Sequence, residues 1–150
     1  MRMSIFLHLM PKITFKSKKK IHDAHDKITA LYNRKQAVMK LYIPRNSQFN
    51  QLRKLLPDDQ FEWICDGERL YDEGLDMGHC VNSYNDYINR DVCAIYSLVY
   101  DNKEHPLEKP VRVTIEFRKR KSGEYYIKQA QTKYNRGCPS EIKEYINSFL

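Results

Sequence analysis

With 150 residues, of which 41% are hydrophobic and 30% charged, the chain has the size and composition of a single globular domain spanning residues 1–150. It contains no run of about eighteen apolar residues, so we expect no membrane-spanning helix and no membrane partner. The net charge of +7 excludes an acidic, solvating protein and is compatible with phosphate-bearing partners.

The cysteines, at positions 65, 80, 93 and 138, are too widely spaced for the disulfide framework of a small secreted protein. They predict reduced thiols and a cytoplasmic location. Because the sequence has neither C-x-x-C nor H-x-x-x-H spacing, we expect no metal site and no other cofactor.

The basic side chains are unevenly distributed. Residues 1–60 carry thirteen basic and four acidic side chains, residues 61–100 carry two and eight, and residues 101–150 carry eleven and seven. Two clusters stand out: Lys16, Lys18, Lys19 and Lys20 in the first, and Arg118, Lys119, Arg120 and Lys121 in the second. Such clusters are either solvated surface or a footprint for the phosphates of a nucleotide or nucleic acid, and the sequence leaves both open.

In the N-terminal 60 residues the pattern is helical. Apolar residues recur at three- and four-residue steps from Ile21 to Met39, which predicts an amphipathic helix over about 18–40. A second, short helix is expected from Ser47, as its N-cap, to Leu56, before Pro57.

The remainder is predicted to be mainly strands. Asp66-Gly67 lies between two runs with apolar residues, so a hairpin of strands 61–65 and 68–71 is expected. Further strands are predicted over 92–100, 111–117 and 125–132, and a closing helix begins after Pro139-Ser140. The fold class is therefore α+β: a mainly antiparallel sheet with N-terminal, central and C-terminal helices packed on it.

The segment from Glu73 to Tyr84 holds two glycines, Gly74 and Gly78, followed directly by His79 and Cys80. We expect a central helix to begin near His79 or Cys80, because Val81, Tyr84 and Ile88 have helical spacing. The free N–H groups of its first turn would favour a phosphate or a thiolate. Three interpretations stay open: a reactive Cys80 thiol, a structural Cys–His pair, or a pocket in which His79 contacts a ligand.

A second group of polar residues lies near the C-terminus. If Ile127 faces the core, strict alternation places Gln129 and Gln131 on the same side, where each must be hydrogen-bonded or border a cavity. Asn135 follows in a turn, where such residues often serve only the turn geometry.

Together these residues resemble the signature of the PcfJ-like proteins. The matching run is Glu73-Gly74-x-x-Met77-Gly78-His79-Cys80-Val81-x-x-Tyr84-x-x-x-Ile88, followed by Ile95–Leu98, Pro110, Thr114–Glu116, Gln129 and Asn135. The resemblance covers residues 68–150, departs from the family pattern at Thr132, and leaves the basic helical part, residues 1–60, unmatched. It implies an origin on a conjugative plasmid or phage, and hence a bacterial host cell, but no established activity.

Three functions are compatible with these patterns. The first is binding of a phosphorylated ligand, either a nucleotide or a nucleic acid. The phosphate would be held by backbone N–H groups near Gly78–Cys80 and by the side chain of His79, and the base or sugar by Tyr84, Gln129 and Asn135. Thr114 is expected to line the same pocket. The second is an enzyme with Cys80 as nucleophile, His79 or His105 as base, and Glu116 or Gln129 as an orienting group. The third is a protein-interaction module, for instance for a host protein, that uses the tyrosine-rich surface.

Overall fold

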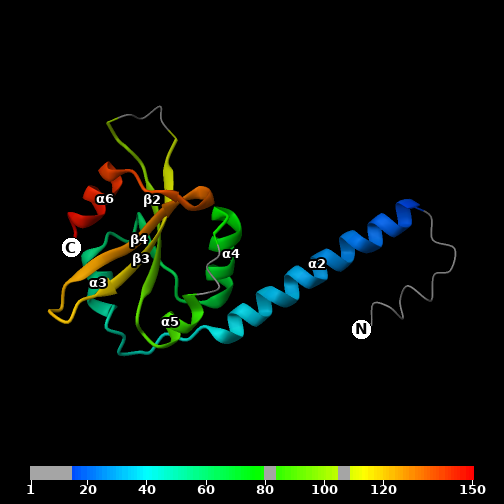
Figure 1. The fold of residues 1–150 in the computed structure, drawn as a ribbon, viewed down its shortest axis with the longest axis horizontal. Coiled ribbons are helices and arrows are strands. Elements are labelled where there is room, and N and C mark those ends of the chain that lie inside the picture. Colours follow the sequence, from blue (N-terminus) through cyan, green and yellow to red (C-terminus); the bar gives the residue numbers. More distant parts are fainter. Residues whose placement is uncertain (1–14, 80–83, 105–108) are drawn as a thin grey trace. The chain divides into compact units, whose positions relative to one another are not determined.

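The computed structural model describes residues 15–79, 84–104 and 109–150 of the chain, which divides into two compact units, Met1–Gln36 and Ala37–Leu150. The predicted N-terminal helix is confirmed as α2, an unbroken helix over Phe15–Lys40 (Figure 1). Lys16, Lys18, Lys19 and Lys20 lie on this helix, and all four are exposed. No helix in the described part of the chain is both long and apolar enough to cross a membrane.

The second unit is built on an antiparallel sheet of five strands, ordered as in the sequence. The strands are β1 (Phe61–Trp63), β2 (Ala94–Tyr100), β3 (Val111–Lys119), β4 (Tyr125–Thr132) and β5 (Arg136–Gly137). The predicted α+β class is confirmed, and the predicted bounds of β4 agree with those observed. Alternation in β3 is also confirmed: Val113, Ile115 and Phe117 enter the main core, while Arg112, Thr114 and Glu116 lie on the other face.

Helices cover both faces of the sheet (Figure 1). On one face, α3 (Asn50–Leu55) and α6 (Ser140–Asn147) close the main core, to which they contribute Leu52, Ile142 and Ile146. On the other face, α4 (Gly67–Met77) and the short α5 (Asn85–Asn89) form a smaller core in which Leu70 and Ile88 pack against Ile95. The smaller core leaves room beside it for polar groups of β3 and β4.

The predicted hairpin at Asp66-Gly67 is wrong, because these residues begin α4. The Asp66 side chain accepts a hydrogen bond from the Arg69 backbone N–H at 2.7 Å and thereby caps the helix. Burial follows a helical spacing, with Leu70, Gly74 and Met77 all facing inward. An Asp-Gly pair suits a hairpin turn and a helix start equally well. Here the packing of the inward face of α4 favours the helix.

The predicted helix start at His79 is also wrong, because α4 ends at Met77 and Gly78 is its C-cap, whereas a start at Cys80 falls outside the described residues. Gly78 adopts a left-handed conformation with φ of +64°, and both its N–H and that of His79 donate to the Gly74 carbonyl oxygen. These two donors are therefore already used and do not form the expected anion site. Among the described residues that follow His79, the next α-helix is α5, which begins at Asn85.

Candidate functional site

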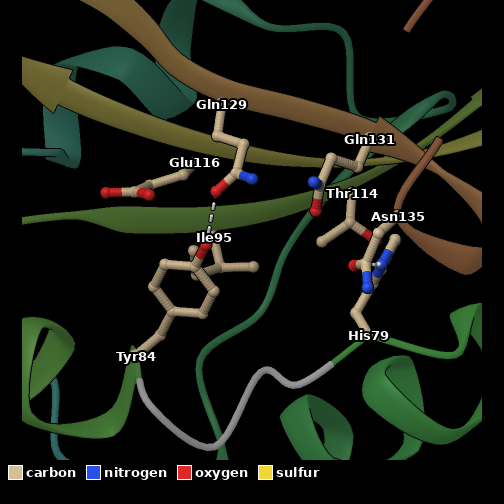
Figure 2. A pocket seen from close by; sticks show the side chains of 8 residues that line it. All are labelled: His79, Tyr84, Ile95, Thr114, Glu116, Gln129, Gln131 and Asn135. Atoms are coloured by element: carbon tan, nitrogen blue, oxygen red, sulfur yellow. Dashed lines mark hydrogen bonds between the residues drawn. The ribbon is translucent and has the colours of Figure 1, made fainter. Parts of the chain in front are cut away.

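A cavity of about 380 Å³ opens on the α4–α5 face of the sheet (Figure 2). Its volume is at the lower end of the range of small-molecule sites. It is lined by His79 after α4, Tyr84 before α5, Ile95 of β2, Thr114 and Glu116 of β3, Gln129 and Gln131 of β4, and Asn135. We call this cavity the polar pocket, because Ile95 is the one aliphatic side chain among those eight.

The structure thus brings together His79, Tyr84, Thr114, Glu116, Gln129 and Asn135, all of which the sequence had marked as candidates. Gly78 is not among the lining residues; it carries the turn that positions His79. Cys80 and His105 lie outside the described residues, so their predicted roles stay predictions.

At one end of the pocket, His79 and Asn135 form a pair. The Nδ1 atom of His79 lies 2.6 Å from Oδ1 of Asn135. Because an amide oxygen only accepts, this bond places a proton on Nδ1 and, in the neutral ring, leaves Nε2 as the acceptor. Nε2 is buried and has no hydrogen-bond partner among the described residues.

At the other end, Tyr84 meets β3 and β4. Its hydroxyl donates to Oε1 of Gln129 at 2.8 Å, as Figure 2 shows. Burial raises the pKa of Tyr84, and the nearby Glu116 carboxylate raises it further. The phenol therefore keeps its proton at neutral pH and stays a donor to Gln129, whose amide NH₂ group is left for a ligand.

Glu116 is a buried carboxylate, 5% exposed, and its Oε2 accepts from Nε of Arg118 at 2.6 Å. Arg118 thus neutralises the acid in the pocket wall and brings one cation to its edge. This contact links the predicted basic cluster directly to a lining residue.

A bulge in β4 explains how its glutamines reach the pocket. Glu116 pairs with Gln129 and Phe117 with Ile127, so Lys128 is an extra residue in β4. Ile127 consequently packs against the main core, while Gln129 and Gln131 line the polar pocket on the opposite face. The predicted placement of Ile127 and the two glutamines on one side is wrong, although the expectation that each glutamine is hydrogen-bonded or borders a cavity is confirmed.

Gly78 also fixes the approach of Asn135 to His79. Tyr134 and Asn135 both have positive φ, 61° and 58°, which is strained for residues with a side chain. The Tyr134 ring lies over Gly78, and a Cβ built there would be 2.7 Å from its Cδ1 atom. A glycine is therefore needed both for the turn and for this contact.

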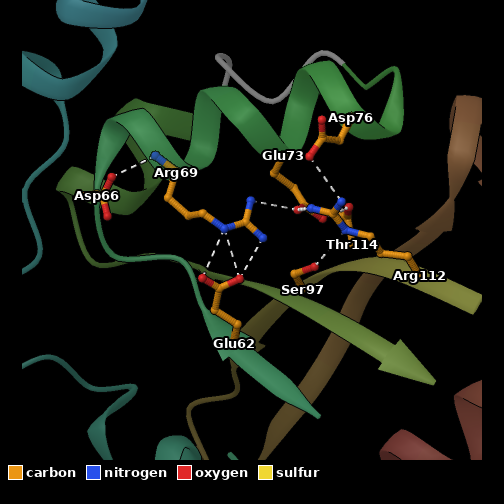
Figure 3. A network of polar contacts seen from close by, with 8 residues as sticks. All are labelled: Glu62, Asp66, Arg69, Glu73, Asp76, Ser97, Arg112 and Thr114. Atoms are coloured by element: carbon orange, nitrogen blue, oxygen red, sulfur yellow. Dashed lines mark hydrogen bonds and ion pairs between the residues drawn. The ribbon is translucent and has the colours of Figure 1, made fainter. Parts of the chain in front are cut away.

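A buried carboxylate holds α4 against the sheet (Figure 3). Glu73 is fully buried; it accepts from Thr114 Oγ1 at 2.7 Å and from Arg112, and pairs with Arg69 at 3.0 Å. Arg69 in turn forms a bidentate pair with Glu62. Because Thr114 donates its proton to Glu73, its hydroxyl presents only lone pairs to the polar pocket.

Comparison of the chain with protein-family models, with curated proteins and with solved structures finds no match in any of the three. Its function is therefore inferred from its own residues. The described residues contain no cluster of three or more His, Cys, Asp or Glu side chains that could hold a metal ion.

Sequence reasoning missed the role of Glu73, which had been noted only as part of a motif. Glu73 stands one helical turn after Arg69 and one turn before Met77. Had the helix been predicted, this spacing would have indicated that Glu73 lies on its inner face. Gln131 had been noted as inward-facing, and its two-residue step from Gln129 was the available signal.

Glu73→Gln should lower the free energy of unfolding by about 3 kcal/mol, because it leaves Arg112 and Arg69 without their buried counter-charge. Asp76→Asn is the matched control: Asp76 also pairs with Arg112, at 3.2 Å, but is 59% exposed, so we expect a loss below about 1 kcal/mol. Urea unfolding of both variants measures the difference. Equal losses of unfolding free energy in the two variants would show that the buried Glu73 carboxylate contributes no more to stability than the exposed Asp76.

Gly78→Ala should displace the Tyr134 ring and with it Asn135. Gly123→Ala is the control, since Gly123 has φ of +97° but nothing within 4 Å of a built Cβ. Backbone strain should cost each variant about 1 kcal/mol. Only Gly78→Ala should shift the side-chain NH₂ resonances of Asn135 in an NMR spectrum, and unchanged resonances would contradict the contact between Tyr134 and Gly78.

Proposed function

We propose that this domain binds a nucleotide, free or within a nucleic acid, with the base and sugar in the polar pocket. The observation that supports this most is the convergence of three side-chain amides, two hydroxyls and an imidazole from separate elements on one cavity. Proteins read unpaired bases in this way, by hydrogen bonds to the base edge and by contact of an aromatic ring with its face.

The internal hydrogen bonds of the pocket define what it offers a ligand. Gln129 and Asn135 each use the amide oxygen internally, toward Tyr84 and His79, so each has its NH₂ group to donate. Thr114 and Glu116 have lone pairs to accept. Such a mixture of donors and acceptors suits a nucleobase, whose edge carries both.

We expect side chains to meet the phosphate, since the N–H groups of Gly78 and His79, the described pair suggested for it, already bond the Gly74 carbonyl oxygen at the end of α4. Arg118 is a cation bonded directly to a lining residue, Glu116. Its remaining N–H groups suit a phosphate oxygen. The resemblance to PcfJ-like proteins, with the implied origin on a mobile genetic element or phage, belongs to this proposal as an expectation.

Calorimetric titration with nucleoside 5′-monophosphates, nucleosides and ribose 5-phosphate tests the function. A nucleotide should bind, its nucleoside more weakly, and ribose 5-phosphate not at all; the nucleotide affinity should fall as salt rises. Gln129→Leu should weaken binding about tenfold by removing one donor, whereas Gln51→Leu, at an exposed position of α3 across the sheet, should have no effect. Absence of binding for every nucleotide up to about 1 mM would overturn the proposal.

A second candidate function, a cysteine-dependent enzyme, is favoured by one observation. The His79–Asn135 bond fixes the imidazole tautomer whose Nε2 accepts a proton, as in an oriented general base. The nucleophile of this candidate would be Cys80, which follows His79 in the chain.

Alkylation at neutral pH separates the two candidates. Burial is the main cause that raises the pKa of Cys93 to about 12, so this thiol should stay unmodified in the folded protein, whereas the exposed Cys65 should react. Burial also raises the pKa of Cys65, so the reference rate is that of free cysteine under the same conditions. For a binding protein, mass spectrometry of the modified chain should show Cys80 reacting no faster than free cysteine, and a rate well above it would favour the enzyme.

A further inference from the structure

Arginine and tyrosine side chains alternate on the sheet face that carries the polar pocket. We call them the Arg–Tyr strip: Tyr87 and Arg90 of the α5 region, Arg118 and Arg120 at the end of β3, and Tyr126 of β4. The guanidinium carbons of Arg118 and Arg90 lie 5.1 and 5.4 Å from the centre of the Tyr87 ring, and that of Arg120 lies 4.2 Å from the centre of Tyr126. These are cation–π distances.

The strip is continuous with the pocket. Glu116 lines the pocket and bonds Arg118, two residues further along the same face of β3. Tyr84 lines the pocket from the N-terminal side of α5, the helix that carries Tyr87.

The bulge at Lys128 is what unites the two surfaces on β4. Tyr126 pairs with Arg118 and Gln129 pairs with Glu116, so both tyrosine and glutamine face the same side. In a regular strand, residues three apart point to opposite faces. The extra residue therefore aligns a stacking group with a hydrogen-bonding group.

The side chains of the predicted basic cluster at the end of β3 lie on both faces of the sheet, because neighbouring residues of a strand point to opposite faces. Arg118 and Arg120 belong to the strip, while Lys119 pairs with Tyr125 on the opposite face and lies 5.3 Å from its ring. Among the described residues, two acids pair with arginines of the strip: Glu116, bonded to Arg118, and Asp86, 2.9 Å from Arg90. With three arginines against two acids, the strip keeps an excess of positive charge.

We propose that the ligand is a single-stranded nucleic acid, with one base in the polar pocket and the neighbouring nucleotides along the Arg–Tyr strip. Aromatic rings alternating with cations are the surface that single strands use, since bases stack on the rings and phosphates meet the cations. A duplex would keep its base edges paired and out of the pocket. This inference rests on the proposed function and adds the polymer and its path.

Fluorescence anisotropy with labelled single strands of one, four and eight nucleotides, and with a duplex of the same sequence, tests the path. Affinity should rise at least about tenfold from the mononucleotide to the tetranucleotide, and the duplex should bind more weakly than its strand. Arg120→Gln should weaken binding of the octanucleotide several-fold and leave mononucleotide binding unchanged. Arg53→Gln, on α3 across the sheet, is the matched control and should change neither.

The outcomes separate this inference from the function beneath it. If a mononucleotide binds but longer strands bind no tighter, or if Arg120→Gln behaves as Arg53→Gln does, the strip is not part of the site and the nucleotide pocket stands. If the duplex binds as well as the single strand, the single-strand inference is overturned. If long strands bind while Gln129→Leu is without effect, the pocket itself takes no base.

Discussion

The buried carboxylate of Glu73 determines where the polar pocket lies. A charge without access to water is tolerated only with its counter-charges and hydrogen bonds in place, and here Arg112, Arg69 and Thr114 supply them. Two of these partners are on β3 and one is on α4 itself, so the helix has one favourable position over the sheet. The end of α4, with Gly78 and His79, is thereby brought to the polar side chains of β3 and β4.

A second constraint acts on the other side of the pocket. The left-handed residues Tyr134 and Asn135 turn the chain after β4, and the Tyr134 ring rests on Gly78. The end of α4 and the turn after β4 thus contact each other directly, and the His79–Asn135 hydrogen bond forms at that contact. Strained backbone next to a cavity is typical of binding sites, where surrounding contacts hold it in place.

The sequence was informative where one physical pattern dominated. Both faces of β3 are buried, but by different partners, so Val113, Ile115 and Phe117 alternate with polar residues and the strand could be located. The candidate residues of the pocket were marked by the resemblance to the PcfJ-like pattern, which includes Thr114, Glu116 and Gln129, whereas simple alternation put Gln129 on the wrong face.

Other features could not be read from the sequence, or could be read in two ways. Asp66-Gly67 serves equally as a hairpin turn or as a helix start, and a glycine such as Gly78 ends helices at least as readily as it precedes them. The spacing of Leu70, Gly74 and Met77 favours the helix once all three are considered together. Nothing in the sequence marks Lys128 as an extra residue, because its side chain is exposed and the pairing that defines a bulge involves residues far along the chain.

That extra lysine has a consequence for how β4 should be aligned with other strands. Tyr126 precedes Lys128 and has an even number, whereas Gln129 and Gln131 follow it and have odd numbers. All three side chains nevertheless lie on the face of the sheet that carries the polar pocket. The strand thus changes phase halfway along its length. Any chain with a β4 shorter by one residue at this point would keep either the ring or the amides on that side, and overall sequence similarity would not reveal which had been lost.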